Sequence, residues 1–168
     1  LYSWANGDSY SGDWIDHQRT GQGVFTWKDG RRYEGEYQND EMHGYGVLSW
    51  PDGRLYEGDF VKGKRTGTGK YISSRGGKYQ GEFVDGERHG YGLYKSYQGW
   101  SYEGDWKNNK RHGYGDYISS SGQHSYREYY RGERIKAPEP EVSSRNQRGK
   151  RCGSYDNPCK IESDTGFE

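Results

Sequence analysis

The chain has few of the residues that fill an ordinary protein interior. Hydrophobic residues make up 28% of its 168 residues, and it holds 2 Cys, 1 Met and 4 Pro. A closed globular core needs more Val, Ile and Leu than this composition supplies. No apolar run approaches the roughly 20 residues that cross a bilayer as a helix, and no signal peptide opens the sequence. We therefore expect a cytoplasmic protein without a conventional core.

An excess of charge of either sign is also missing. The chain carries 25 basic and 25 acidic residues. Nucleic-acid-binding proteins show a basic excess, and anionic membranes are recognised by basic clusters. We therefore expect no nucleic-acid partner, and the overall charge gives no support for attraction to a membrane surface.

Glycine and aromatic residues are abundant instead, and they recur every 23 residues. Each copy is counted from an opening tyrosine as position one, and these are Tyr10, Tyr33, Tyr56, Tyr79 and Tyr102. Position three is Gly, position four is acidic and position five is aromatic. A Gly-x-Gly pair follows at positions twelve and fourteen, then a large apolar residue at sixteen and a last Gly at twenty-one. An unbroken period of this length is typical of a stacked repeat array.

The spacing within each copy predicts strands. Positions one, three and five share one strand face as aromatic, Gly and aromatic, which is period two. A flat ring can lie over a glycine of the neighbouring strand because no Cβ obstructs it. Asp29-Gly30 and Pro51-Asp52-Gly53 are tight-turn signals, whereas positions seven to eleven are polar and variable, as in an exposed loop. We expect an all-β fold, an elongated single antiparallel sheet of stacked β-hairpins.

The boundaries follow from the same alignment. Residues 1–9 match the second half of a unit, residues 10–125 hold five repeats, and residues 126–136 are expected to be a degenerate capping strand. This strand is aligned from Tyr126, with Glu128 where Gly belongs. Residues 137–168 are Pro-containing and polar, which predicts a disordered tail or linker. A half unit leaves an unpaired strand edge, through which a homodimer is possible.

The repeated motif resembles the MORN (membrane occupation and recognition nexus) repeat. The resemblance rests on Tyr-x-Gly-acidic-aromatic followed by His-Gly-x-Gly, in register over about residues 10–125. It implies that each repeat is a hairpin and that the hairpins stack into a twisted sheet with a groove. Family members include cytoskeletal and ciliary scaffold proteins, junctional membrane linkers, and repeat modules attached to lipid kinases or a lysine methyltransferase. Cytoskeletal or ciliary assembly is therefore the setting that the resemblance suggests.

No group of residues forms a recognisable catalytic or metal site. His43, His89 and His112 share one repeat position, but consecutive hairpins lie roughly 10 Å apart and metal–His bonds are about 2 Å long, so packing is favoured over a shared ion. The acid at position four recurs in every copy, whereas a catalytic pair is normally singular. Cys152 and Cys159 are too few for a zinc site, and free thiols or a disulfide remain open. We expect no enzyme activity, no cofactor and no metal.

Two sets of aromatic residues are candidates for partner binding. Position thirteen lies between the paired glycines and faces away from them, and the repeat does not require an aromatic residue there. Tyr45, Tyr91 and Tyr114, with Val47 and Leu93 nearby, therefore form a possible binding stripe, although plain cross-strand pairing is the alternative. The second set comprises Trp27 and Trp50 at position eighteen, since later copies have Ser there.

The sequence therefore predicts a non-enzymatic scaffold that binds a peptide or amphipathic helix of a protein partner along the array. Two alternatives stay open. One is a regulatory module of a larger protein such as a lipid kinase. The other is a module that targets membrane phospholipid, which is possible but not favoured.

Overall fold

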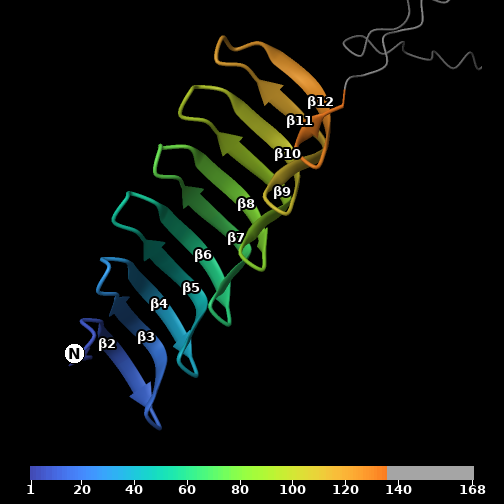
Figure 1. Cartoon of the computed structure of the whole chain (residues 1–168). Helices are drawn as coiled ribbons and strands as arrows, with labels where there is room; N and C mark the ends of the chain where they lie inside the picture. Colours follow the sequence, from blue (N-terminus) through green and yellow to red (C-terminus); the bar gives the residue numbers. More distant parts are fainter. Residues whose placement is uncertain (136–168) are drawn as a thin grey trace, which may run out of the picture. The chain divides into compact units, whose positions relative to one another are not determined.

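The computed structural model describes residues 1–135, which form one open antiparallel sheet of 13 strands (Figure 1). Strand order follows chain order, so each strand pairs with the next. The strands are β1 (Tyr2–Ser3), β2 (Ser9–Ile15), β3 (Gln18–Thr26), β4 (Arg32–Gln38), β5 (Glu41–Ser49), β6 (Leu55–Val61), β7 (Lys64–Ile72), β8 (Lys78–Val84), β9 (Glu87–Lys95), β10 (Ser101–Lys107), β11 (Lys110–Ile118), β12 (His124–Tyr130) and β13 (Glu133–Arg134). The expected all-β fold of stacked hairpins is confirmed.

None of the described residues forms a helix long and apolar enough to cross a bilayer. The predicted tail or linker, residues 137–168, lies outside the described residues.

Two kinds of turn alternate along the sheet. Within a hairpin the strands are joined by two residues of positive φ, as at Asp16 (φ 48°) and His17 (φ 65°). Such turns suit the right-handed twist of paired strands. They are shorter than the exposed loop that the variable positions seven to eleven suggested, because residues 18–20 already belong to β3. Between hairpins a wider turn is closed by bonds such as Gly30 N to Trp27 O at 2.9 Å.

A continuous row of glycines runs across β2 to β11, because the glycines at positions three and fourteen pair with one another through every strand. The opening tyrosine lies over this row. A Cβ placed on Gly81 would lie 2.5 Å from the Gly92 Cα and 2.6 Å from the Tyr79 hydroxyl oxygen. The ring is then fixed by its hydroxyl, which donates to the backbone oxygen of Glu82 at 3.0 Å. The predicted stacking of rings over bare backbone is confirmed.

The buried rings form a zigzag ladder that is the core of the sheet. Tyr33 makes edge-to-face contacts with Tyr37 of its own hairpin and Phe60 of the next, at centroid distances of 5.2 and 5.1 Å. The pattern repeats from Tyr10 to Tyr129, and the five opening tyrosines are at most 1% exposed. Edge-to-face contact is the favoured arrangement of aromatic rings. Each ring therefore ties its own hairpin to a neighbour.

The repeated acid has a backbone role. Glu82 Oε1 accepts a hydrogen bond from the Tyr91 backbone N at 2.9 Å. The bond spans a bulge, where Gly90 takes φ +54°, a conformation that favours glycine. Equivalent bonds are made by the acids at position four of the first three copies, Asp13, Glu36 and Asp59.

The two ends of the array differ from its middle. At the first end, Tyr2 pairs with Tyr10 as Phe25 pairs with Tyr33. At the other end, the register differs from the sequence alignment by one residue.

In β12, Ser125 pairs with Tyr117, the place of an opening tyrosine, and Arg127 pairs with Gly115. Arg127, and not Glu128, therefore stands where glycine belongs. Its guanidinium lies 3.5 Å from the centre of the Tyr117 ring.

The glycine row gives a stability prediction. Gly81→Ala should lower the free energy of unfolding by about 2 kcal/mol, because the new methyl group must displace Gly92 or the Tyr79 ring. Urea denaturation followed by circular dichroism measures this. Gly53→Ala is the matched control, since a Cβ there meets nothing within 4 Å and only the strain of its φ of +84°, about 1 kcal/mol, applies. Equal stability of the two variants would contradict the proposed stacking.

Burial of the ladder gives a pH prediction. Burial raises the pKa of Tyr79 to about 12, and it also raises the pKa of Tyr33, Tyr56 and Tyr102. Because the folded-state values exceed the unfolded value near 10, the stabilisation is complete below pH about 10 and is lost as pH rises toward 12. The phenolate absorbance of these buried rings should therefore appear together with loss of the circular dichroism signal. Ionisation of all tyrosines near pH 10 in a folded sheet would refute the prediction.

Candidate partner-binding face

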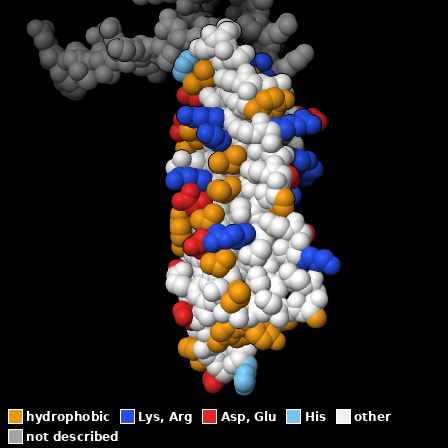
Figure 2. All heavy atoms as spheres, turned by 90° about the vertical axis from the view of Figure 1, so that its left-hand side faces the viewer, with side chains coloured by type: hydrophobic (Ala, Val, Ile, Leu, Met, Phe, Trp, Pro, Cys, Tyr) orange, Lys and Arg blue, Asp and Glu red, His pale blue; other side chains and the backbone are white. Residues whose placement is uncertain are grey.

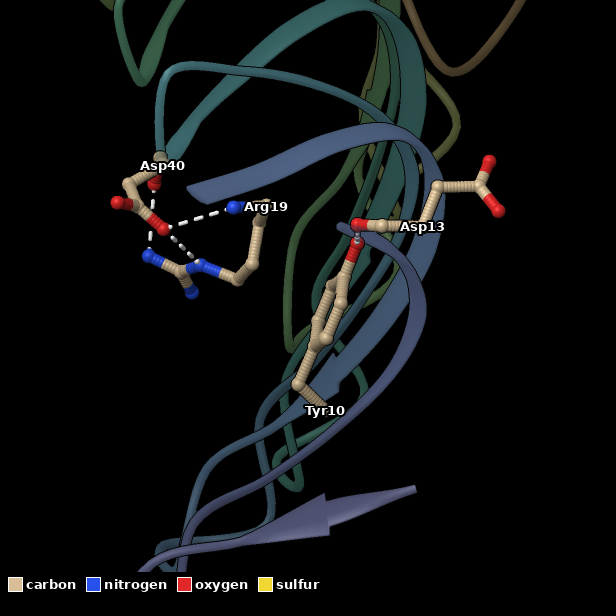
Figure 3. A network of polar contacts seen from close by, with 4 residues as sticks. All are labelled: Tyr10, Asp13, Arg19 and Asp40. Atoms are coloured by element: carbon tan, nitrogen blue, oxygen red, sulfur yellow. Dashed lines mark hydrogen bonds and ion pairs between the residues drawn. The ribbon is translucent and has the colours of Figure 1, made fainter. Parts of the chain in front are cut away.

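The sheet has two unlike faces. The ladder face carries the glycine row and the buried rings at positions one and five. The opposite face, here called the tyrosine face, carries positions two, four, thirteen and fifteen, which alternate with the glycines along each strand. Figure 3 shows this division at Asp13, whose carboxylate points away from the Tyr10 ring while its backbone oxygen accepts the Tyr10 hydroxyl at 3.1 Å.

The three tyrosines predicted to form a stripe all lie on the tyrosine face. Tyr45, Tyr91 and Tyr114 are 51%, 55% and 50% exposed. The Tyr45 hydroxyl donates to Glu57 Oε1 at 2.5 Å, and this bond raises the pKa of Tyr45. Tyr114 stacks on Tyr126 with a centroid distance of 5.7 Å. The rings are therefore partly exposed but held by neighbours on the same face.

A hollow of about 490 Å³ opens between Tyr45 and Tyr91. It exists because the third copy has Thr68 at position thirteen, where the second and fourth copies have tyrosine. The floor is glycine backbone, including Gly58 and Gly69.

Val47 and Leu93, the other two residues of the predicted stripe, stand at position fifteen. Both are half-buried, and Leu93 lines the hollow. Figure 2 shows, for one side of the array, that hydrophobic side chains recur along its length with charged side chains among them.

Trp27 and Trp50 lie elsewhere. Both are half-buried and pack against the ladder. Trp27 is 4.7 Å from the Phe25 ring, and the Arg31 guanidinium lies 4.8 Å from its centre. Arg54 covers Trp50 in the same way, at 5.0 Å. The two predicted sets of aromatic residues are therefore on opposite faces and do not form one site.

A row of arginines on the ladder face was not singled out from the sequence. Arg19, Arg65, Arg88 and Arg111 stand at position ten, and each guanidinium covers three rings at 4.2–5.8 Å. Arg19 also reaches the next hairpin turn, where it binds Asp40 Oδ1 through Nε at 3.0 Å (Figure 3). The same 23-residue period marks this row, but Met42 interrupts it in the second copy.

Acidic residues at position two were also missed. Glu57 and Glu103 line the hollow beside Tyr45 and Tyr91. Glu34 occupies the same position one copy earlier. The signal was present in the sequence as Glu at a fixed place in three of five copies, with Ser11 and Gln80 as the exceptions.

The structure gives no metal centre within residues 1–135, where no group of three or more His, Cys, Asp or Glu is placed to hold an ion. His43, His89 and His112 lie on the separate strands β5, β9 and β11. The His112 ring lies 5.7 Å from that of Tyr130. Cys152 and Cys159 lie outside the described residues.

An open sheet of repeated hairpins, packed by rings on one face and exposed on the other, is the architecture of a β-hairpin repeat protein. The profile of the MORN repeat matches five consecutive segments of the chain. These segments are residues 10–31, 33–53, 56–78, 79–101 and 102–124. The chain belongs to the MORN repeat family, which confirms the resemblance noted in the sequence.

Comparison with other proteins adds a structural similarity. The sheet is similar to the SAS-4 (dCPAP) TCP domain of Drosophila melanogaster, solved in complex with a proline-rich motif of Ana2 (dSTIL). The two are 13% identical, with a TM-score of 0.45 over 73% of this chain and 67% of that chain. No curated protein matches the sequence.

Proposed function

We propose that the repeat array is a non-enzymatic scaffold that binds a peptide segment or amphipathic helix of a protein partner on the tyrosine face. The observation that carries the proposal is the line of half-exposed tyrosines with a glycine-floored hollow between Tyr45 and Tyr91. Tyrosine supplies a large contact area with little loss of conformational freedom, which is why it is enriched at binding surfaces.

The spacing of the tyrosines suits an elongated ligand. One repeat is two strand spacings, or about 9.6 Å. Tyr91 and Tyr114 are one repeat apart, and Tyr45 and Tyr91 are two repeats apart, about 19 Å. A helix advances about 10.5 Å over seven residues, so side chains seven apart meet successive repeats. An extended segment reaches the same points with about three residues per repeat.

The setting of this scaffold is part of the proposal. We place it in the cytoplasm, in cytoskeletal or ciliary assembly, as the family resemblance suggests. A regulatory module of a larger protein, such as a lipid kinase, is the alternative, and no described contact favours it. Homodimerisation through an exposed sheet edge ranks lower than binding of a separate partner.

The tyrosine line can be tested directly. The triple variant Tyr45→Ser, Tyr91→Ser and Tyr114→Ser should lose the partner in affinity capture from cell lysate, with captured proteins quantified by mass spectrometry. Its circular dichroism should match that of the unmodified chain, because half-exposed rings outside the ladder contribute little to packing.

The matched control replaces two equally exposed aromatic residues away from the line, Tyr2→Ser and Tyr97→Ser, which are 53% and 56% exposed. This variant should retain the partner. Retention by the triple variant as well would show that the tyrosine face is not the binding site.

Membrane targeting is tested separately. The chain should remain in the supernatant after sedimentation with phosphatidylserine-containing vesicles at physiological salt, since acidic side chains on the tyrosine face repel an anionic surface. Neutral phosphatidylcholine vesicles serve as the control. Salt-sensitive binding to the anionic vesicles alone would favour the phospholipid alternative.

A further inference from the structure

The charge in the middle of the tyrosine face is mostly negative, although the chain as a whole is neutral and the next row of the same face carries Arg32, Lys78 and Lys95. Two rows of side chains run across the middle of this face. In one row the residues at positions two and fifteen of neighbouring strands pair, and in the other row those at positions four and thirteen pair. Together they hold ten carboxylates against one basic residue, Lys70. The carboxylates are Asp13, Glu34, Glu36, Glu57, Asp59, Glu82, Glu103, Asp105, Asp116 and Glu128.

Five of these carboxylates, Asp13, Glu36, Glu57, Asp59 and Glu82, accept hydrogen bonds, but the set is hardly neutralised. Within residues 1–135, a single ion pair involves any of the ten, Arg32 to Glu34 at 2.7 Å. Glu36 and Glu82 accept backbone N–H groups, and Glu57 accepts the Tyr45 hydroxyl. Neutral donors fix the carboxylates in place and leave their charge uncompensated. Partial burial and the Glu103 carboxylate raise the pKa of Tyr91, which agrees with a negative environment.

Tyrosines and carboxylates alternate around the hollow. Tyr45 with Glu57 stands on one side, Tyr91 with Glu103 on the other, and Lys70 lies between them. A guanidinium can stack on a ring and pair with a carboxylate at the same time. The chain itself uses this chemistry on its other face, where Arg19 covers rings and binds Asp40.

We propose that the tyrosine face recognises a basic, arginine-bearing segment of its protein partner, whose cationic side chains pair with Glu57 and Glu103 on either side of the hollow. This inference rests on the proposed function and names the chemistry of the partner. Lys70 opposes such a ligand inside the hollow, and Lys78 and Lys95 oppose it in the adjoining row. Charge complementarity of this kind sets partner choice and the rate of encounter.

The test uses the full chain and a fluorescein-labelled peptide of Arg-Gly-Ser triplets, with a Glu-Gly-Ser peptide as the negative control. Fluorescence anisotropy measures the dissociation constant at physiological salt. Glu57→Gln with Glu103→Gln should weaken binding about tenfold, as expected for the loss of two exposed ion pairs. Lys70→Glu should strengthen it severalfold, and the Glu-Gly-Ser peptide should not bind.

The matched control removes the same amount of charge from the hairpin turns. Asp16 and Asp85 have positive φ, which Asn accepts, so Asp16→Asn with Asp85→Asn should leave binding within about twofold of the unmodified chain. Equal weakening by both double variants would mean that the peptide senses net charge only, and would overturn the proposal.

Two further variants separate the remaining outcomes. The triple tyrosine variant tests the surface itself: if it loses the lysate partner while Glu57→Gln with Glu103→Gln retains both partner and peptide, the charge inference fails and the proposed function stands. Arg148, Lys150 and Arg151, outside the described residues, offer a basic segment within the chain. If changing these three to Gln tightens peptide binding more than about fivefold, the chain's own segment is the occupant and the proposal is overturned.

Discussion

The structure depends on one contact, a tyrosine ring lying flat over glycine backbone, repeated in each of the five repeats. A single sheet has no second layer to cover its apolar side chains, so these side chains must be buried against the backbone of the sheet and against one another. The glycine row lets the rings sink onto the backbone, and the edge-to-face contacts join each ring to those on both sides. Arginines then cover the rings from outside. Each hairpin is therefore stabilised by its contacts with the adjacent hairpins, as in other repeat proteins.

Because the buried rings of the ladder all lie on one face, the other face is less constrained by packing. Position thirteen shows this freedom, since it holds Gln22, Tyr45, Thr68, Tyr91 and Tyr114 in successive copies without a change in the register of the sheet. Position one, under the packing requirement, is tyrosine in all five repeats. Differences between copies on the tyrosine face are thus differences in surface, and they create the hollow at Thr68.

Much of this arrangement could be predicted from the sequence. The 23-residue period defines the hairpins. The alternation of side chains along a strand assigns each position to a face and places the opening tyrosine on the same face as the glycines. The same alternation places position eighteen on the face that carries the glycines, so the burial of Trp27 and Trp50 could also have been predicted. The register of β12 was also within reach, because the 23-residue period counted from Tyr102 falls on Ser125. The alignment on Tyr126 departed from that period, whereas turn bonds such as Gly122 N to Ser119 O hold Ser125 in the tyrosine place. The contacts of the arginine row could not be predicted in this way. The 23-residue period shows the row itself, but stacking of a guanidinium on rings leaves no mark in a hydrophobic pattern.

The acids of the tyrosine face divide into two groups with different freedom. Those at position four hold the bulge beside a positive-φ glycine, so the fold requires an acceptor there in each copy. Those at position two have no such backbone role, and Ser11 and Gln80 replace Glu there without altering the ladder. The fold thus supplies a constant background of negative charge, while position two adjusts it copy by copy. The proposed selectivity for a ligand therefore rests on positions two, thirteen and fifteen, where the hairpin itself requires no particular residue.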